Sequence, residues 1–340
     1  MAELSPRTRA VLALVVQEYI STAQPVGSKT IVEAYGLKVS PATIRNEMKL
    51  LEELGYLTHP HTSAGRVPTQ EGYRYFVEHL LPDQPLSVDD QLMIQHQFYQ
   101  VRQEFDQWAQ LAAAVLAHTS RMAGLATPLR IDTSRFKHVE LVEVREGLVL
   151  MVLVLYQGVV RQQLIHLDRS MSQEELSQLS NQLNALLGGK TAAEIEAMVL
   201  PLSAFGQRVQ RMISALMSRE DQAGTEMVYR EGLSHILAQP EFANADEVHQ
   251  VVAVLEQPPL LGSIFEDVRR NPGVQVMISG GGQYQALRDL SLVLSRYGMD
   301  ESMAGVLGVV GPVRMPYGRV IALVRYVAKL MSDMVSEWYA

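Results

Sequence analysis

One predicted helix carries side chains that suit the edges of DNA bases. The segment 41–54 has helical spacing, and the face opposite its apolar residues carries Thr43, Arg45, Asn46 and Lys49. An arginine can donate two hydrogen bonds to guanine, and an asparagine can pair with the edge of adenine. A lysine and a helix N-terminus can hold phosphates. The pattern is therefore typical of a helix that contacts bases in a DNA groove.

The elements before this helix predict a helix-turn-helix unit. Serine followed by proline begins the first and third helices, as an N-cap followed by proline at the first helical position. Ser28 is expected to cap the second helix, which ends at Gly36 in a left-handed conformation. The three expected helices are 6–21, 29–35 and 41–54.

A small hairpin follows these helices. Two short strands, 56–58 and 66–67, enclose a loop from His59 to Gly65 that is small, polar and free of acids. Such a loop suits a wing that lies along a phosphate backbone. A fourth helix from the cap Thr69 follows, so the segment predicts a winged helix-turn-helix domain.

The expected DNA contacts lie in the third helix, the second helix and the wing. Those of the recognition helix are Ser40, Ala42, Thr43, Arg45, Asn46 and Lys49. Those of the second helix and the wing are Ser28, Lys29, His61, Thr62, Ser63, Gly65 and Arg66. The alternative is a neutral helical unit that packs against another surface, with Arg45 and Lys49 left in solvent.

The charge of the chain is unevenly distributed. Of its 340 residues, 29 are Lys or Arg and 37 are Asp or Glu, which gives a net charge of −8. Residues 1–80 carry eight basic and eight acidic side chains, so the excess of acid lies entirely in the remaining chain. An acidic protein repels a polyanion, and any nucleic-acid site must therefore be local.

The composition excludes several classes of protein. The chain has no cysteine, which rules out a disulfide scaffold, a thiolate zinc site and a cysteine nucleophile. The longest apolar run, 148–156, falls short of the ~18 residues that a membrane-spanning helix requires. The N-terminus carries Glu3 and Pro6 and does not resemble a signal peptide. We expect a soluble, cytoplasmic protein without membrane contacts.

Residues for catalysis or metal binding do not gather in the sequence. His59 and His61 could form a metal pair, but the nearest further histidine is His79. The glycines 280–282 could cradle a phosphate, yet they lack a lysine and the G-x-G-x-x-G spacing, so a strand-to-helix turn explains them better. We expect no enzyme activity, no metal and no cofactor.

The remaining chain predicts strands and helices in alternating blocks. Residues 89–122 are expected to form one long helix or two nearly continuous ones, whose apolar stripe could be a dimer coiled coil or could cover a sheet. The strand over 148–156 is apolar on both faces, so we expect both of its sides to be covered. An all-helical block over 172–217 follows. The expected strands are 138–144, 148–156, 159–167, 274–278 and 303–310.

Four separated motifs resemble the HrcA family of heat-inducible transcription repressors. They occur in the order and at the spacing of that family. They are 19–28 (YISTAQPVGS), 40–48 (SPATIRNEM), 61–69 (HTSAGRVPT) and 72–74 (GYR). The likeness continues at 229–232, 239–242 and 308–315, whereas Val313 and the loop 279–283 depart from the family pattern.

The resemblance implies a multidomain α+β fold. It implies a winged helix-turn-helix domain over 1–82, a GAF-like α/β domain in two parts, 88–170 and 251–340, and an inserted helical dimerisation subdomain over 171–250. It also implies a homodimer that binds the CIRCE inverted repeat in double-stranded DNA and blocks chaperone operons until heat stress. The chaperonin is the implied partner that keeps such a repressor active.

Two other interpretations stay open at this point. A winged-helix regulator could use the same Arg45 and Asn46 but respond to a small molecule bound in its GAF-like domain. Stabilisation of the protein by a metabolite would favour that interpretation. A purely structural dimerisation protein would bind no DNA sequence specifically.

Overall fold

The structure of the protein is a computed structural model. It describes residues 4–60, 65–101, 105–131, 133–156, 158–167, 170–223, 227–242, 244–256, 258–278, 287, 289–300 and 303–339. Its contacts divide the chain into two compact units. Unit 1 comprises Met1–Pro128, Val228–Gly298 and Gly305–Ala340, and unit 2 comprises Leu129–Met227 and Met299–Ala304.

The N-terminal part of unit 1 is a winged helix-turn-helix domain. Its helices are α1 (Pro6–Thr22), α2 (Ser28–Ala34), α3 (Pro41–Glu53) and α4 (Gln70–Tyr75), and α4 continues into a π-helical segment, η1 (Phe76–Leu80). Its two antiparallel strands are β1 (Leu57–Thr58) and β2 (Val67–Pro68). This order of elements confirms the prediction.

Helix capping follows the expected chemistry at α1, α3 and α4, where Thr69 accepts the N–H of Gly72 at 3.1 Å, and differs at α2. Ser5 and Ser40 each accept a hydrogen bond from the backbone N–H three residues on, at 3.2 Å and 3.1 Å. The prediction that Ser28 caps α2 is wrong. Gly27 is the N-cap in an extended conformation, since glycine is tolerated there, and Ser28 is the first helical residue with its side chain buried. Gly36 is left-handed, as expected.

The rest of unit 1 is built on a sheet whose described strand pairs are antiparallel. Its strands lie in the order β8 (Tyr229–Glu231), β3 (Ala123–Ala126), β11 (Met303–Pro312), β10 (Leu290–Asp300) and β9 (Val274–Ile278). In unit 2, the short β4 (Arg130–Ile131) pairs with Met303 and Ala304 at the start of β11.

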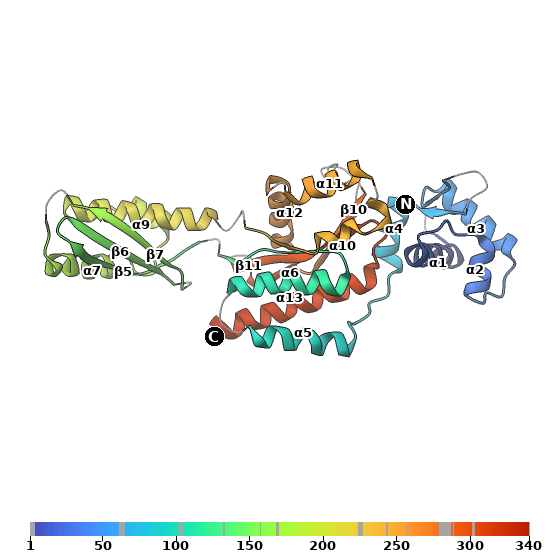
Figure 1. Ribbon diagram of the computed structural model, residues 1–340, viewed down its shortest axis with the longest axis horizontal. Helices are drawn as coiled ribbons and strands as arrows, with labels where there is room; N and C mark the ends of the chain where they lie inside the picture. The colour runs from blue at the N-terminus through green and yellow to red at the C-terminus, as the bar shows by residue number, and fades with distance from the viewer. Residues whose placement is uncertain are drawn as a thin grey trace. The chain divides into compact units, whose positions relative to one another are not determined.

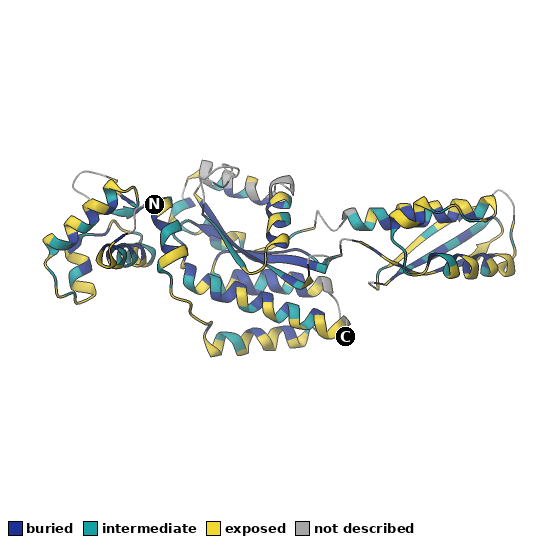
Figure 2. Ribbon diagram, turned by 180° about the vertical axis from the view of Figure 1, so that it is seen from behind, coloured by how far each residue is buried: buried dark blue, intermediate teal, exposed yellow. Residues whose placement is uncertain are grey.

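Helices cover both faces of this sheet (Figure 1). One side holds α6 (Phe105–Ser120), α13 (Tyr317–Tyr339) and, packed against α13, α5 (Val88–Gln100). The other side holds α10 (Leu233–Leu237), the 3-10 helix η2 (Pro240–Phe242), α11 (Ala245–Glu256) and α12 (Pro258–Arg270). The strands β3, β10 and β11 between them are buried along most of their length (Figure 2). The two layers of helices thus enclose the main core of unit 1.

The apolar stripe expected over 89–122 lies inside the fold. It belongs to two helices, α5 and α6, and its residues Phe98 and Trp108 are 1% and 3% exposed. Helix α6 packs against β3 and α5 packs against α13, so the α6 part of the stripe covers a sheet and the α5 part covers another helix. The buried residues of the stripe are not available for a coiled coil.

Unit 2 is a three-stranded antiparallel sheet with helices on one face. The strands β5 (Phe136–Arg145), β6 (Leu148–Leu155) and β7 (Val160–His166) form a meander and confirm the three strands expected over 138–167. The helices are α7 (Gln173–Leu187), α8 (Ala192–Ala197) and α9 (Ala204–Ala223). Capping boxes at Ser172 and Thr191 begin α7 and α8. The expectation that β6 is covered on both sides is wrong, because residues on alternate positions of β6 are only half-buried.

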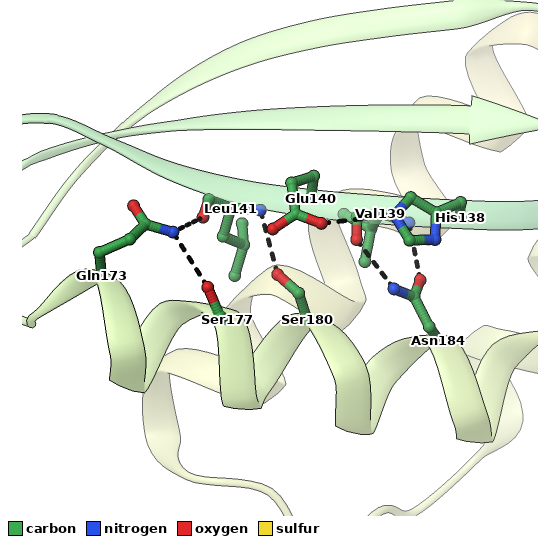
Figure 3. A network of polar contacts seen from close by, with 8 residues as sticks. All are labelled: His138, Val139, Glu140, Leu141, Gln173, Ser177, Ser180 and Asn184. Carbon is green, nitrogen blue, oxygen red and sulfur yellow. Dashed lines mark hydrogen bonds and ion pairs between the residues drawn. The ribbon is translucent and has the colours of Figure 1, made fainter.

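Polar side chains of α7 bond to the backbone along the outer edge of β5 (Figure 3). The N–H of Leu141 donates to Oγ of Ser180 at 3.0 Å, and the N–H of Val139 donates to Oδ1 of Asn184 at 2.7 Å. Gln173 donates from Nε2 to the carbonyl of Leu141 at 3.0 Å. The helix therefore satisfies backbone groups that a neighbouring strand would otherwise bind.

This arrangement differs from the domain boundaries that the sequence suggested at residues 170 and 250. The strands over 136–166 pack against α7 and α9 rather than joining the larger sheet. The inserted unit is consequently a sheet with helices, not an all-helical subdomain. An apolar strand pattern indicates which side chains are buried but not which sheet the strand joins.

Candidate nucleic-acid interface

Helix α3 presents an exposed polar face. Its apolar residues Ile44, Met48 and Leu51 are at most 3% exposed and pack inside the winged helix-turn-helix domain. The remaining surface, which we call the outward face, is formed by exposed residues of the expected recognition set. They are Ala42, Arg45, Asn46 and Lys49.

The functional side chains of the outward face are available for a ligand. Within the described part of the chain, Arg45 and Asn46 have no hydrogen-bond or ion-pair partner. Lys49 lies 3.6 Å from Glu53, and their side chains are 72% and 62% exposed. An ion pair that exposed contributes little to stability, so a phosphate can replace Glu53 at small cost.

Two of the expected recognition residues serve the helix itself. Oγ of Ser40 accepts the N–H of Thr43, and the two hydroxyl oxygens lie 3.0 Å apart. The pair fixes the first turn of α3. A helix N-terminus carries a partial positive charge, so this turn still suits a phosphate through its backbone N–H groups.

The acids of α3 are held away from its N-terminal half. Glu47 accepts a hydrogen bond from Thr8 of α1 at 2.8 Å. Glu52 pairs with Arg66 at 2.8 Å and also contacts His59. Glu53 pairs with Lys49, more than a full turn beyond the expected base contacts at Arg45 and Asn46. The N-terminal half of the outward face is therefore positive.

The second helix contributes one exposed cation. Lys29 is exposed and forms no ion pair within the described chain, whereas Ser28 is 8% exposed. The structure thus places Lys29 at the surface and Ser28 in the packing between helices. Of these two expected support residues, Lys29 has the position that a phosphate contact requires.

The base of the wing is fixed by backbone and side-chain contacts. Val26 and Arg66 exchange two backbone hydrogen bonds, at 2.8 Å and 2.9 Å. A Cβ on Gly65 would lie 2.6 Å from the backbone of Val26, so this glycine allows the close approach. The expected wing residues His61, Thr62 and Ser63 lie outside the described residues.

The role of Glu52 is not visible in the sequence pattern. The loop 59–65 contains no acid, but Glu52 reaches its base from α3 and engages Arg66 and His59. The contact between Glu52 and Arg66 spans 14 residues and a turn, so no local pattern in the sequence predicts it. His59 is thereby tied to a carboxylate, and among the described residues no group of His, Asp and Glu could hold a metal ion.

Comparison with known proteins assigns the family. The model "Winged helix-turn-helix transcription repressor, HrcA DNA-binding" matches residues 3–79, and the model "HrcA protein C terminal domain" matches residues 106–321. The chain belongs to the HrcA family. The expected resemblance to HrcA is thereby confirmed.

Individual relatives agree over the full length. The heat-inducible transcription repressor HrcA of Roseiflexus sp. (strain RS-1) is 46% identical, with 99% of this chain and 96% of that protein covered. The protein of the same description from Herpetosiphon aurantiacus is 45% identical, with 99% and 97% covered. These descriptions point to a regulator of transcription rather than an enzyme.

A solved structure supports the fold alone. A crystal structure at 2.2 Å, described only as that of a hypothetical protein, is similar to this chain with a TM-score of 0.59 and 24% identity, covering 98% of each chain. Within the described residues of this HrcA-family chain, no helix has the length and apolar character needed to cross a bilayer.

Proposed function

We propose that the chain represses chaperone operons by binding a CIRCE-type inverted repeat in double-stranded DNA as a homodimer. The outward face of α3 carries this proposal, because Arg45 and Asn46 are exposed there and the neighbouring acids are engaged elsewhere. Family membership supports heat-shock genes as the genes that are repressed, since the relatives are described as heat-inducible transcription repressors.

Binding to DNA tests the proposal directly. Fluorescence anisotropy compares a CIRCE-type repeat with a scrambled duplex over a series of salt concentrations. We expect a preference of about 10³-fold or more for the repeat. Equal affinity for the two duplexes, with a steep salt dependence, would mean that phosphate contacts dominate and would contradict the assigned operator.

The open face of the unit 2 sheet supports the homodimer. Residues across the three strands stand in register on this face, in rows such as Val142–Leu150–Leu164 and His138–Val154–Val160. Val142, Val160 and Leu164 are 40%, 47% and 56% exposed. An apolar patch of this kind is typical of an interaction site. A two-fold operator requires a two-fold protein, so we assign the patch to a second copy of the chain.

The remaining parts of the proposal concern regulation. The sheet of unit 1, with helices on both faces, supports a GAF-like domain. The chaperonin keeps the repressor active, and unfolded proteins compete for the chaperonin under heat stress in the cytoplasm. Adding purified chaperonin should raise the fraction of protein that binds the operator. An unchanged active fraction would contradict the chaperonin as a partner.

A further inference from the structure

Two segments with family likeness, 239–242 and 308–315, meet in unit 1. Nε of Arg314 donates to Oε1 of Glu241 at 2.5 Å, and Nη2 donates to Oε2 of the same carboxylate at 3.4 Å. The side chains are 15% and 29% exposed. The two-point contact distinguishes this pair from a single-contact pair at the surface. The hydrogen bond to Glu241 and the charge of that carboxylate raise the pKa of Arg314, while burial acts in the opposite direction.

The same guanidinium also contacts the winged helix-turn-helix domain. Its Nη1 donates to the backbone carbonyl of Ile20 at 2.8 Å. Ile20 lies in the last turn of α1, where α1 has no basic residue of its own. The carbonyls at a helix C-terminus favour a cation, and Arg314 supplies one. We call the contacts among Arg314, Glu241 and Ile20 the Arg314 clamp.

Tyrosines extend the contact beside the Arg314 clamp. The ring of Tyr73 from α4 lies 6.1 Å from the ring of Tyr317, the first residue of α13. Both are at most 3% exposed, and burial raises the pKa of each hydroxyl. The hydroxyl of Tyr317 bonds to Ser291 at 2.9 Å, while that of Tyr73 has no partner among the described residues. An unpaired buried hydroxyl costs stability, so surrounding contacts must hold Tyr73 in place.

We propose that Arg314 is a positioning residue for operator binding. Through Glu241 and Ile20 it fixes the winged helix-turn-helix domain on the body of unit 1, which narrows the range of separations between the two α3 helices of a dimer. This inference rests on the proposed function, because only a dimer on an inverted repeat has a separation to fix. Lysine cannot replace Arg314, because an ammonium lacks the planar fork that reaches the carboxylate and the carbonyl together.

A scan of half-site spacing in the full-length protein tests the clamp. The two half-sites of the inverted repeat are moved apart or together in steps of one base pair, and a duplex with a single half-site is measured beside them. For Arg314→Met we expect affinity for the optimal spacing to fall by about tenfold, since the contribution of a second linked contact depends on geometry. Affinity for the single half-site should stay within about twofold, since the outward face of α3 is untouched.

A matched variant separates this role from a general loss of stability. Arg161 makes an equivalent two-point ion pair with Glu220 in unit 2, at 2.6 Å and 2.7 Å. Arg161→Met should leave the spacing profile unchanged. Arg314→Lys should resemble Arg314→Met, and Glu241→Gln provides a second variant should Arg314→Met fail to fold.

The outcomes are distinct. A flattened spacing profile with intact half-site binding supports the clamp. A sharp profile in Arg314→Met or Glu241→Gln, or an equal loss on the single half-site, overturns it. If the unaltered protein prefers no inverted repeat over scrambled DNA, the proposed function fails before any variant is measured.

Discussion

Nη2 of Arg66 lies 2.8 Å from Oε2 of Glu52, so an ion pair joins the wing to helix α3. Both side chains are less than a quarter exposed, at 24% and 22%, which protects the pair from solvent screening. The base of the wing at Arg66 is therefore held against α3. The guanidinium of Arg66 is thus engaged in this contact.

The first prediction concerns this pair. Arg66→Ala should weaken binding to the operator and to scrambled DNA by about the same factor, because we expect the wing to contact the phosphate backbone and not the bases. Anisotropy with both duplexes checks the result, and Glu52→Gln should reproduce part of it by loosening the same joint. A loss confined to the operator would show that Arg66 contributes to sequence preference.

The second prediction concerns base recognition. Arg45→Ala should cost roughly 1–3 kcal/mol on the operator and relax preference at one base position, because a forked contact with a base edge is lost. The matched control is Lys49→Ala on the same outward face. It should weaken all sequences alike and reduce the salt slope by about 1. If Arg45→Ala lowered the affinity for all DNA sequences by the same factor, Arg45 would not contribute to base recognition.

The third prediction concerns the open face of the unit 2 sheet. Leu164→Glu should raise the dimer dissociation constant by about 10²-fold or more, because each copy would bury an unpaired carboxylate. Val199, which is 98% exposed in unit 2, gives the control variant Val199→Glu. Sedimentation velocity distinguishes monomer from dimer. A dimer unaffected by Leu164→Glu would place the interface elsewhere.

The fourth prediction concerns the base of the wing. Gly65→Ala should destabilise the winged helix-turn-helix domain by about 1–3 kcal/mol, because its Cβ would force the backbone of Val26 to move. In Gly262→Ala the new methyl group meets no atom within 4 Å, and a helix gains about 1 kcal/mol from this exchange. Calorimetry of the full chain checks that Gly65→Ala lowers the stability and that Gly262→Ala raises it. Equal stability of the two variants would contradict the packing role of Gly65.

Local signals in the sequence predict much of the fold. Ser5 and Ser40 cap their helices as expected, and Ser172 and Thr191 form capping boxes, because each of these contacts spans only three residues. The outward face of α3 also follows from helical spacing alone. Nothing in the structure tests which of its residues touch DNA, and those roles stay predictions.

Contacts between distant segments are where the sequence falls short. The pairing of Arg314 with Glu241 spans 73 residues, and that of Arg66 with Glu52 joins a loop to a helix. Neither produces a periodic pattern. For the same reason, the sequence did not predict that β5, β6 and β7 form a sheet of their own. Alternating apolar residues identify the buried face of a strand but not the strands or helices that it packs against.

The side chains of α7 that bond along β5 determine how far copies of this chain can assemble. Copies of a sheet can stack edge to edge into a fibre only if both edge strands of each copy have unpaired backbone N–H and C=O groups. Gln173, Ser180 and Asn184 occupy backbone groups of Val139 and Leu141 on one such edge. Growth through this edge of the unit 2 sheet is thereby blocked, while the homodimer that we propose through the open face is a closed, finite pair. Because α7 occupies the outer edge of β5, the open apolar face of the unit 2 sheet can be exposed without starting edge-to-edge aggregation of the sheet.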